Sequence, residues 1–405
     1  GPGNTLAEWQ DRARLSSPAI LQCELLLKQA EENQKSHWRA IYPLELGGSV
    51  QTGQYQENRP LSVNPLQYPE KGRDGLSGWD LEVSQRLNLS GARLKNKDLL
   101  EARLRYQKLE CEKVGQETRI IVAENLYAIQ LLGDLASDLR QVIQRLERIR
   151  RNLTGSYRDP AMGSYALHSI GANLREHRED LNRVELEKLS KEKELSLLMG
   201  GERLAPPPEA PATQMLPAIS SLSPVRALAQ NALQSQIRIQ ESHLLAAGLS
   251  EPMTLFASGG QKEIGAPRTI LESYEKESYV RAGFRLPVFS GGPQLRALRG
   301  ARQAQAREAV ALKNQEKDIT HRFELLKKDY SQLREQVLIL MPLRQQAAGQ
   351  INLLERALLL GRISYGDFWS GHELWHKQEV HYVRLVMEAR EKLRQIELMA
   401  GDAND

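Results

Sequence analysis

The sequence predicts a mixed α/β protein built from two copies of one unit, with long coiled helical hairpins and four amphipathic strands. The first observation is a ladder of matching pieces: Ser17-Pro18 recurs as Ser223-Pro224, and Ser36-His37 recurs as Ser242-His243 at the same offset. The second is a pair of helical stretches of roughly sixty to seventy residues. The third is a pair of alternating segments before each of them. Because the matching pieces occur in the same order at a nearly constant offset, they indicate a duplicated architecture more strongly than any single local pattern.

The first copy, residues 1–200, opens with helices. Residues 5–15 predict a short amphipathic helix, and the next helix, about 17–38, has Ser17 as N-cap and Pro18 in its first turn. The period then changes from 3.6 to 2. Segments at about 43–54 and 78–89 alternate apolar and polar residues, which predicts two strands of a hairpin. Their apolar face needs a cover, either a protein core or lipid.

A long helix at about 91–153 follows the hairpin. Its apolar residues recur in steps of three and four, the spacing of coiled-coil packing: Leu132, Leu135, Leu139, Val142, Leu146 and Ile149. Gly155 supplies the left-handed residue that reverses the chain into a return helix at about 160–199. The proline-rich segment 201–222 is predicted to be a linker that cannot be helical.

The second copy, residues 223–400, repeats this order, and 401–405 form a tail. Its expected elements are helices at about 224–243, 292–360 and 366–399, a weak strand at about 245–258 interrupted by Pro252, and a strand at about 279–289. Pro342 lies inside the second long helix and predicts a kink rather than an end, because the apolar pattern resumes after it. Gly361 is the expected reversal point.

Composition excludes several classes of protein. Of the 405 residues 26% are charged and the net charge is +4, but the signs are mixed, so a nucleic-acid partner is not expected. Cys23 and Cys111 lie in helical patterns and are expected to be small buried residues, neither a disulfide nor a metal site. No run approaches the eighteen or so apolar residues of a membrane-spanning helix, which leaves membrane strands open. Gly1-Pro2-Gly3 is read as a cloning remnant before a trimmed mature sequence.

Three motifs resemble the TolC family of outer-membrane efflux channels, possibly its heavy-metal (CzcC- or CusC-like) members. Thr5-Leu6-Ala7-Glu8 with Ser17-Pro18 resembles the opening helix of the family. The stretch from Arg285 to Gly292 is similar to its strand-to-helix junction "L-x-x-P-L-F-x-G-G". The stretch from Leu360 to Phe368 resembles the pattern at the periplasmic helix tips. The resemblance covers almost the whole chain.

The resemblance implies a homotrimer in the bacterial outer membrane, extending into the periplasm. Each protomer would give four strands to a twelve-stranded barrel in outer-membrane lipid and its helices to a periplasmic α-barrel. Such proteins are passive exit ducts for metal ions, drugs or other small molecules, with no catalytic residues and no cofactor. They dock onto a periplasmic adaptor, also called a membrane fusion protein, and an inner-membrane pump.

The resemblance also implies functional residues at the helix tips. Asp367 would project into the lumen as an anionic ring, with Arg362 and Ser370 beside it; Ser370 stands where a second aspartate is common. Arg362, Arg158 and Asp159 would form ion pairs at the tips that hold a gate shut. The tips that contact the adaptor would comprise Gly155, Tyr157, Arg158, Asp159, Gly361, Ser364 and Tyr365.

Two alternatives stay open. His372-Glu373-Leu374-Trp375-His376 matches the H-E-x-x-H pattern of zinc metallopeptidases, in which both imidazoles share one helix face and the glutamate activates water. Glu397 could serve as a distant third ligand of that zinc site, and incidental metal binding would involve His372, His376 and His381. No downstream Gly-x-x-His completes such a site, so no metal is expected. A soluble coiled-coil scaffold would account for the helices and not for the alternating segments.

Overall fold

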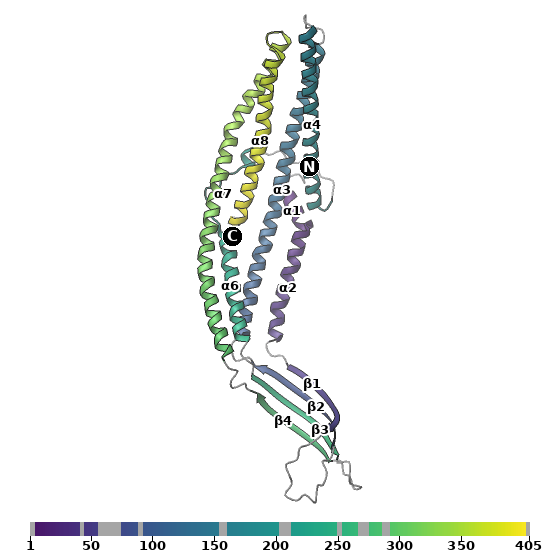
Figure 1. Ribbon diagram of the computed structural model, residues 1–405, viewed down its shortest axis with the longest axis vertical. Coiled ribbons are helices and arrows are strands. Elements are labelled where there is room, and N and C mark those ends of the chain that lie inside the picture. The colour runs from purple at the N-terminus through teal and green to yellow at the C-terminus, as the bar shows by residue number, and fades with distance from the viewer. Residues whose placement is uncertain are drawn as a thin grey trace, which may run out of the picture. The chain divides into compact units, whose positions relative to one another are not determined.

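The computed structural model describes residues 5–40, 44–55, 74–87, 92–153, 160–201, 212–248, 253–265, 275–285 and 292–401. The elements in chain order are α1 Leu6–Ser16, α2 Pro18–Ala40, β1 Leu44–Tyr55, β2 Asp74–Leu87, α3 Ala92–Leu153, α4 Pro160–Leu198, α5 Ala212–Met215, α6 Val225–Gly248, β3 Met253–Gly265, β4 Glu275–Arg285, α7 Pro293–Leu359 and α8 Tyr365–Ala400 (Figure 1). The expected combination of long helices and an antiparallel four-stranded sheet is confirmed.

The described chain forms two compact units. The helical unit comprises Gly1–Lys28, Tyr106–Ala232 and Leu312–Asp405, and the sheet unit comprises Gln29–Arg105 and Leu233–Ala311. Helices α2, α3, α6 and α7 therefore contribute residues to both. Within the sheet unit, polar contacts link the helices: Arg103 of α3 binds Glu241 of α6 at 2.6 Å, and His37 of α2 lies 3.1 Å from the amide of Asn96 in α3.

The core of the helical unit follows the apolar seam of α3. All six seam residues named above are buried. Leu139 belongs to a cluster with Phe323 of α7 and Val386 of α8. Ile149 belongs to a second cluster with Ile170 of α4 and residues of α7 and α8. Because the seam repeats every three or four residues, one stripe of α3 meets the neighbouring helices along much of its length.

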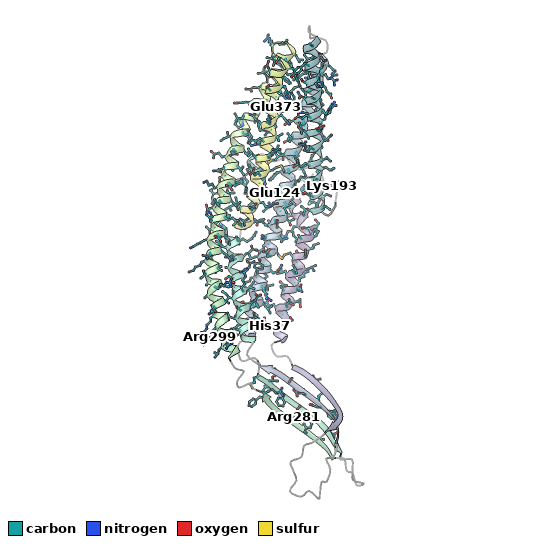
Figure 2. All side chains as sticks on the ribbon, viewed as in Figure 1. His37, Glu124, Lys193, Arg281, Arg299 and Glu373 are labelled. Carbon is teal, nitrogen blue, oxygen red and sulfur yellow. A yellow bond between two sulfur atoms is a disulfide. The ribbon has the colours of Figure 1, made fainter. Side chains whose placement is uncertain are left out.

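A polar contact also joins α3 to α8 within this unit. Glu124 of α3, labelled in Figure 2, accepts a charge-assisted hydrogen bond from Arg394 of α8 at 3.3 Å. Burial raises the pKa of Glu124, and Arg394 and Arg390 oppose that change. The α3–α8 contact is therefore not purely apolar. Asp138 of α3 makes a second polar contact with α8.

Helix α1 packs against α3 and α4. Its start is fixed by a capping box, in which the Thr5 hydroxyl accepts from the Glu8 amide and the Glu8 carboxylate accepts from the Thr5 amide. Trp9 and Ala13 are buried in a third cluster with Val122 and Leu126 of α3 and Leu195 of α4. Helix α4 ends at Leu198, and Gly200 in the turn that follows has a positive φ of 77°, the left-handed conformation expected of a glycine after a helix end.

The expected linker, residues 201–222, needs correction in its second half. Ala212–Met215 is a short helix, and Met215, Leu216 and Ile219 are buried in the core cluster around Leu139. Side chains of the long helices bind its carbonyls: Arg390 donates to Met215 at 2.9 Å and Tyr330 donates to Pro217 at 2.6 Å. The proline-based prediction was wrong here because Ala212 to Met215 contain no proline and Met215 and Leu216 supply apolar surface.

The two cysteines form a disulfide, which corrects the expectation of separate buried thiols. Cys23 of α2 and Cys111 of α3 are bonded, with their Cα atoms 5.5 Å apart. The side-chain amide of Gln107 lies 3.7 Å from one sulfur and 3.8 Å from the other. The prediction failed because helical spacing places each cysteine on its own helix and does not tell which helices are neighbours.

The described strands form one antiparallel sheet in the order β1-β2-β3-β4 (Figure 1). The weak strand expected from about 245 is wrong at its start: α6 continues to Gly248 and β3 begins at Met253. Leu244 to Ala247 are strong helix formers, which explains the longer helix. Pro252 and residues 286–289, expected to end the last strand, lie outside the described residues. Strand β4 begins at Glu275, and β2 begins at Asp74.

One stretch of α3 has the composition of a membrane-spanning helix, which the sequence reading did not expect. An 18-residue window within Lys95–Leu153 has a mean hydropathy of 1.2, and 67% of it is buried. That burial is typical of the core helix of a helical unit. Helix α7 continues through Pro342 without ending, as expected.

Candidate functional site

The turn between α7 and α8 is closed by Gly361. Its φ of 69° is left-handed. The Gly361 amide donates to the Leu358 carbonyl and the Arg362 amide donates to the Ala357 carbonyl, both at 2.9 Å. These two bonds are a Schellman motif, which satisfies carbonyls at the end of α7 and needs a residue that adopts positive φ at low cost. Gly361 therefore lies at the helix reversal where the sequence placed it.

Asp367 lies in the first turn of α8 as part of a capping box. Ser364 is the N-cap, its hydroxyl accepts from the Asp367 amide at 3.1 Å, and the Asp367 carboxylate accepts from the Ser364 hydroxyl at 2.6 Å and amide at 3.2 Å. These hydrogen bonds lower the pKa of Asp367, which is exposed. Asp367 is thus an ionised side chain at a helix end, partly engaged by its own cap.

The other expected tip residues have different positions. Arg362 is exposed, and the Ser370 hydroxyl donates to the Gly366 carbonyl at 3.0 Å. Tyr365 is buried, and its hydroxyl accepts from the Asn173 amide of α4 at 2.8 Å, which links the two return helices. Burial raises the pKa of Tyr365 to about 12. The first reversal, Gly155, Tyr157, Arg158 and Asp159, lies outside the described residues.

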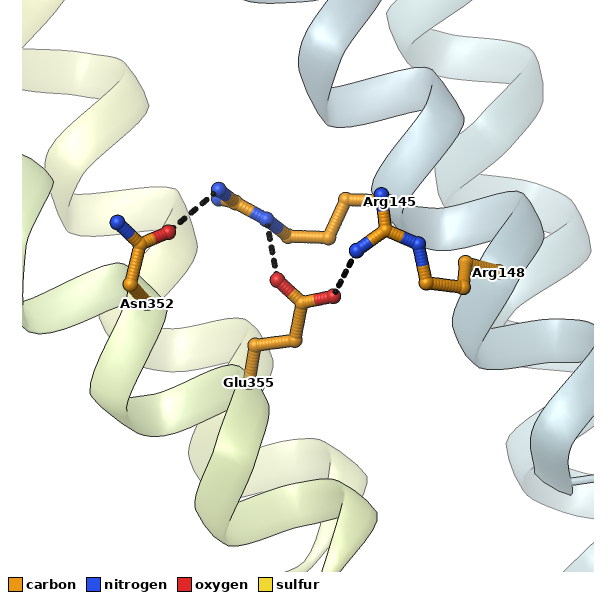
Figure 3. A network of polar contacts seen from close by, with 4 residues as sticks. All are labelled: Arg145, Arg148, Asn352 and Glu355. Carbon is orange, nitrogen blue, oxygen red and sulfur yellow. Dashed lines mark hydrogen bonds and ion pairs between the residues drawn. The ribbon is translucent and has the colours of Figure 1, made fainter.

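A buried network between α3 and α7 was missed by the sequence reading (Figure 3). Glu355 is 8% exposed and binds Arg145 at 2.9 Å and Arg148 at 3.1 Å, and Arg145 also donates to Asn352 at 3.0 Å. A carboxylate that bridges two guanidinium groups is a strong contact at low exposure. The sequence did carry a signal, because Glu355 is an acidic residue inside an apolar stretch of α7. A single acidic residue of this kind is usually interpreted as a solvated charge.

The H-E-x-x-H segment lies in an aromatic packing core. His372 is fully buried among rings of Phe368, Trp369 and Trp375. Glu373, labelled in Figure 2, forms an exposed ion pair with Lys377 at 3.1 Å. His381 is exposed. Among the residues that the structure describes, no three His, Cys, Asp or Glu side chains are arranged to hold a metal ion.

A third histidine, His177 of α4, joins this core and was not singled out from the sequence. Its ring centroid lies 4.8 Å from that of His376 and 5.6 Å from that of His372. Burial lowers the pKa of His177 to about 4 and that of His372 to about 3, so both imidazoles are neutral near pH 7. Burial also lowers the pKa of His376, and the carboxylate of Asp180, 3.8 Å away, opposes that change. The rings pack α4 against α8.

The strand register separates the sheet into two chemically different faces. Leu46, Val83, Ala257 and Ala282 lie opposite one another across the four strands, and Leu81 lies in the next row with Val280. Residues directly opposite share a face. We call this the apolar face, comprising Leu46, Trp79, Leu81, Val83, Leu255, Ala257, Val280, Ala282 and Phe284. It is not covered by the described chain: Val280 is 90% exposed and Leu46 is 70% exposed.

The opposite face carries polar residues, and we call it the polar face. Glu82, Ser258 and Arg281 lie in one row, where the guanidinium of Arg281 donates to the Ser258 hydroxyl at 3.1 Å (Figure 2). Phe256 is an apolar residue on this face. Its ring covers Gly283 on the neighbouring strand, where an added Cβ would lie 3.1 Å from the ring. This pairing of an aromatic ring with a strand glycine stabilises a sheet position that lacks a side chain.

Comparison with known proteins identifies the fold. The sequence matches no protein-family model, and no curated protein matches it. Several solved structures are similar to the chain. Three of them are the Campylobacter jejuni CmeC outer membrane channel (13% identity, TM-score 0.68, 100% of this chain and 90% of that chain), a Pseudomonas aeruginosa membrane protein (13%, 0.73, 98% and 92%), and the open state of the Neisseria gonorrhoeae MtrE outer membrane channel (11%, 0.72, 98% and 89%).

Coverage of nearly the whole length of both chains means that the similarity includes the sheet as well as the helices. The level of identity shows the fold and leaves the function to be argued from the chain itself. Because the similar structures include outer-membrane channels, the resemblance suggested by the three motifs is confirmed for the fold of the single chain. This chain has the fold of the TolC-family outer-membrane channels.

Proposed function

We propose that the chain is one subunit of a trimeric outer-membrane export channel, with no catalytic chemistry of its own. The observation that carries the proposal is the uncovered apolar face of the sheet. Exposed side chains such as Val280 and Trp79 would be costly in water and stable against hydrocarbon. The polar face, with Asp80, Glu82 and Arg281, suits a water-filled lumen.

Strand pairing supports the trimer. In the described sheet β1 and β4 each pair with one neighbour, so each keeps one edge of unpaired backbone groups. Such edges are not stable in lipid, where every backbone N–H and C=O needs a partner. If β4 of one protomer pairs with β1 of the next, three protomers close a twelve-stranded barrel without an edge.

The disulfide and the element order support the location and the architecture. A disulfide between α2 and α3 persists in an oxidising compartment such as the periplasm and not in a reducing cytosol. We infer an internal duplication from the order α2-β1-β2-α3-α4, which is followed by α6-β3-β4-α7-α8. In the proposed assembly the helices of three protomers form a periplasmic α-barrel.

The gate is proposed at the α7–α8 turn and at the corresponding turn after α3. Asp367 would form a ring of three carboxylates, and its low pKa keeps that ring ionised. Gly361 and Ser364, with Gly155, Tyr157, Arg158 and Asp159 of the first reversal, would contact a periplasmic adaptor that connects to an inner-membrane pump. Tyr365 was expected in this set, but its side chain is buried against α4. Small molecules or metal ions remain the predicted cargo, and the heavy-metal resemblance remains a prediction.

Electron microscopy of the detergent-purified protein tests the assembly. We expect a hollow cylinder with three-fold symmetry and a trimer mass by light scattering. A monomer that stays dispersed in buffer without detergent would contradict the proposal and would favour the soluble scaffold.

Planar-bilayer recordings test the ring separately. Asp367→Asn should reduce the preference for cations, because each trimer loses three negative charges, while Glu373→Gln, an exposed acid six residues further along α8, should change it less. Equal effects of both variants would exclude Asp367 as the selectivity ring and would leave the channel proposal standing.

A further inference from the structure

A buried charged cluster joins three helices of the helical unit away from the turn at Gly361. Arg344 of α7 binds both carboxylate oxygens of Glu379 in α8, at 2.9 and 2.5 Å. The guanidinium lies 3.8 Å from the ring centroid of Tyr382, also in α8. Glu379 and Tyr382 are each 5% exposed. A bidentate arginine pair stacked on an aromatic ring fixes α7 against α8.

Asp138 of α3 brings a second carboxyl group to this pair. It hydrogen-bonds Glu379, so two carboxyl groups face one guanidinium at a poorly hydrated position. Burial first, and then the charge of Glu379, raise the pKa of Asp138 to about 6, while Arg344 opposes the change. Asp134, one turn earlier on α3, adds a further negative charge. The groups that act on Asp138 thus come from α3, α7 and α8.

Charge balance makes the cluster sensitive to one proton. With Asp138 protonated, its O–H donates to Glu379, and Arg344 neutralises the one remaining carboxylate. With Asp138 ionised, two carboxylates share one cation and the hydrogen bond between them is lost. Pro342 lies two residues before Arg344 and removes one backbone hydrogen bond from α7, so this stretch of α7 relies more on side-chain contacts.

We propose that Asp138, Arg344 and Glu379 form a proton-dependent clamp that holds α3 against the α7–α8 pair when Asp138 carries a proton, and that loosens when the proton leaves. The clamp is a property of one protomer and does not require the channel function. If the protomers do form a channel, the clamp couples the packing of its helix barrel to the pH of the compartment around it.

Infrared spectroscopy of the full-length protein in detergent tests the protonation step directly. The carboxylic C=O band of the protonated, half-buried Asp138 should be present at pH 5, lost with a midpoint near 6, and missing from the spectrum of Asp138→Asn. A wild-type protein without a band that Asp138→Asn removes would overturn the proposal. This measurement remains decisive even if substitutions at Glu379 prevent folding.

Thermal unfolding tests the mechanical consequence. An asparagine in place of Asp138 would keep the size of the side chain and a hydrogen-bond donor without a charge. Wild-type stability from this group falls as the pH rises from about 3.8, the ordinary pKa of an aspartic acid, to about 6. Asp138→Asn should therefore unfold slightly above the wild-type temperature at pH 5 and several degrees further above it at pH 8. Asp98→Asn, which changes an exposed aspartate on the same helix that does not act on Asp138, is the control and should give the same small difference at both pH values. An Asp138→Asn difference that does not change between pH 5 and 8 would show a purely structural side chain and would overturn the clamp.

Discussion

Arg148 of α3 and Glu355 of α7 form a salt bridge with an Nη1–Oε1 distance of 3.1 Å, between residues 207 positions apart. That separation is close to the offset at which Ser17-Pro18 recurs as Ser223-Pro224. Under the proposed duplication, the two long helices therefore meet at nearly equivalent positions. The same holds for Arg145 and Asn352, which also lie 207 positions apart.

Replacing Glu355 by alanine should destabilise the helical unit by about 2 to 3 kcal/mol, because Arg145 would remain poorly exposed without its anion. The cost stays at this level because Arg148 is 58% exposed and can be rehydrated. The midpoint of urea unfolding in detergent measures the effect. Glu373→Ala, which breaks an exposed pair with Lys377, should cost less than about 1 kcal/mol; similar losses would mean that Glu355 is not a special contact.

Two helix glycines should respond oppositely to alanine. A Cβ on Gly371 of α8 would lie 2.6 Å from Cδ1 of Leu354 in α7, whereas a Cβ on Gly349 of α7 meets open space. Gly349→Ala should stabilise the protein by up to about 1 kcal/mol through helix propensity. Gly371→Ala should destabilise it by about 1 kcal/mol, because Leu354 must repack. Thermal unfolding of both variants measures the difference, and a stabilised Gly371→Ala protein would show that α7 and α8 do not approach closely there.

Removing the disulfide should lower stability without changing the fold. The bond closes a span of 88 residues, and the constraint on the unfolded chain is on the order of 2 to 4 kcal/mol. A double Cys23→Ala and Cys111→Ala protein should unfold at a lower temperature, and reductant should lower the midpoint of the wild-type protein alone. Free thiols detected in the unfolded, unreduced wild-type protein would contradict the bond.

The fold could be predicted from the sequence because its signals are periodic. The seam from Leu132 to Ile149 and the alternation around Leu81 each repeat many times, so single exceptions do not obscure them. The glycine at 361 could be placed because a helix reversal needs a residue with positive φ. The start of β3 was misplaced because Leu244 and Ala246 suit a helix as well as a strand.

The contacts between distant helices could not be predicted in the same way. Cys23 and Cys111, or His177 and His376, are joined by packing that no local pattern encodes. Glu355 and Asp138 read as ordinary charges in helical segments, because burial of a single charge depends on which neighbours cover it. The sequence therefore predicted the turn at Gly361 correctly. It did not predict the polar contacts that Glu355 and Asp138 make between the helices.

The histidine core should make the protein sensitive to acid. Burial lowers the pKa of His177 from 6.5 to about 4, so below pH 6.5 the unfolded chain binds protons that the folded protein does not. Stability from this group is complete above pH 6.5, falls as the pH decreases toward 4, and then levels off. At about 1.4 kcal/mol per pKa unit the loss is on the order of 3 kcal/mol.

Unfolding midpoints at pH 7 and pH 4.5 measure this loss. His177→Leu should lose less stability between the two pH values than the wild-type protein does. His168→Leu, which changes an exposed histidine on the same helix, should follow the wild-type curve. Parallel curves for His177→Leu and wild type would show that His177 is protonated freely in the folded protein.

The two faces of the sheet should tolerate charge differently if the apolar face contacts lipid. Val280 lies on the apolar face near the middle of β4, and the adjacent Tyr279 lies on the polar face. Val280→Arg should cost about 2 to 4 kcal/mol for folding into lipid vesicles, the penalty for arginine at mid-bilayer depth. Tyr279→Arg should cost less, because its side chain would face water. The measurement is urea unfolding in vesicles, followed by intrinsic tryptophan fluorescence. Equal penalties at the two positions would rule out a lipid-facing side of the sheet.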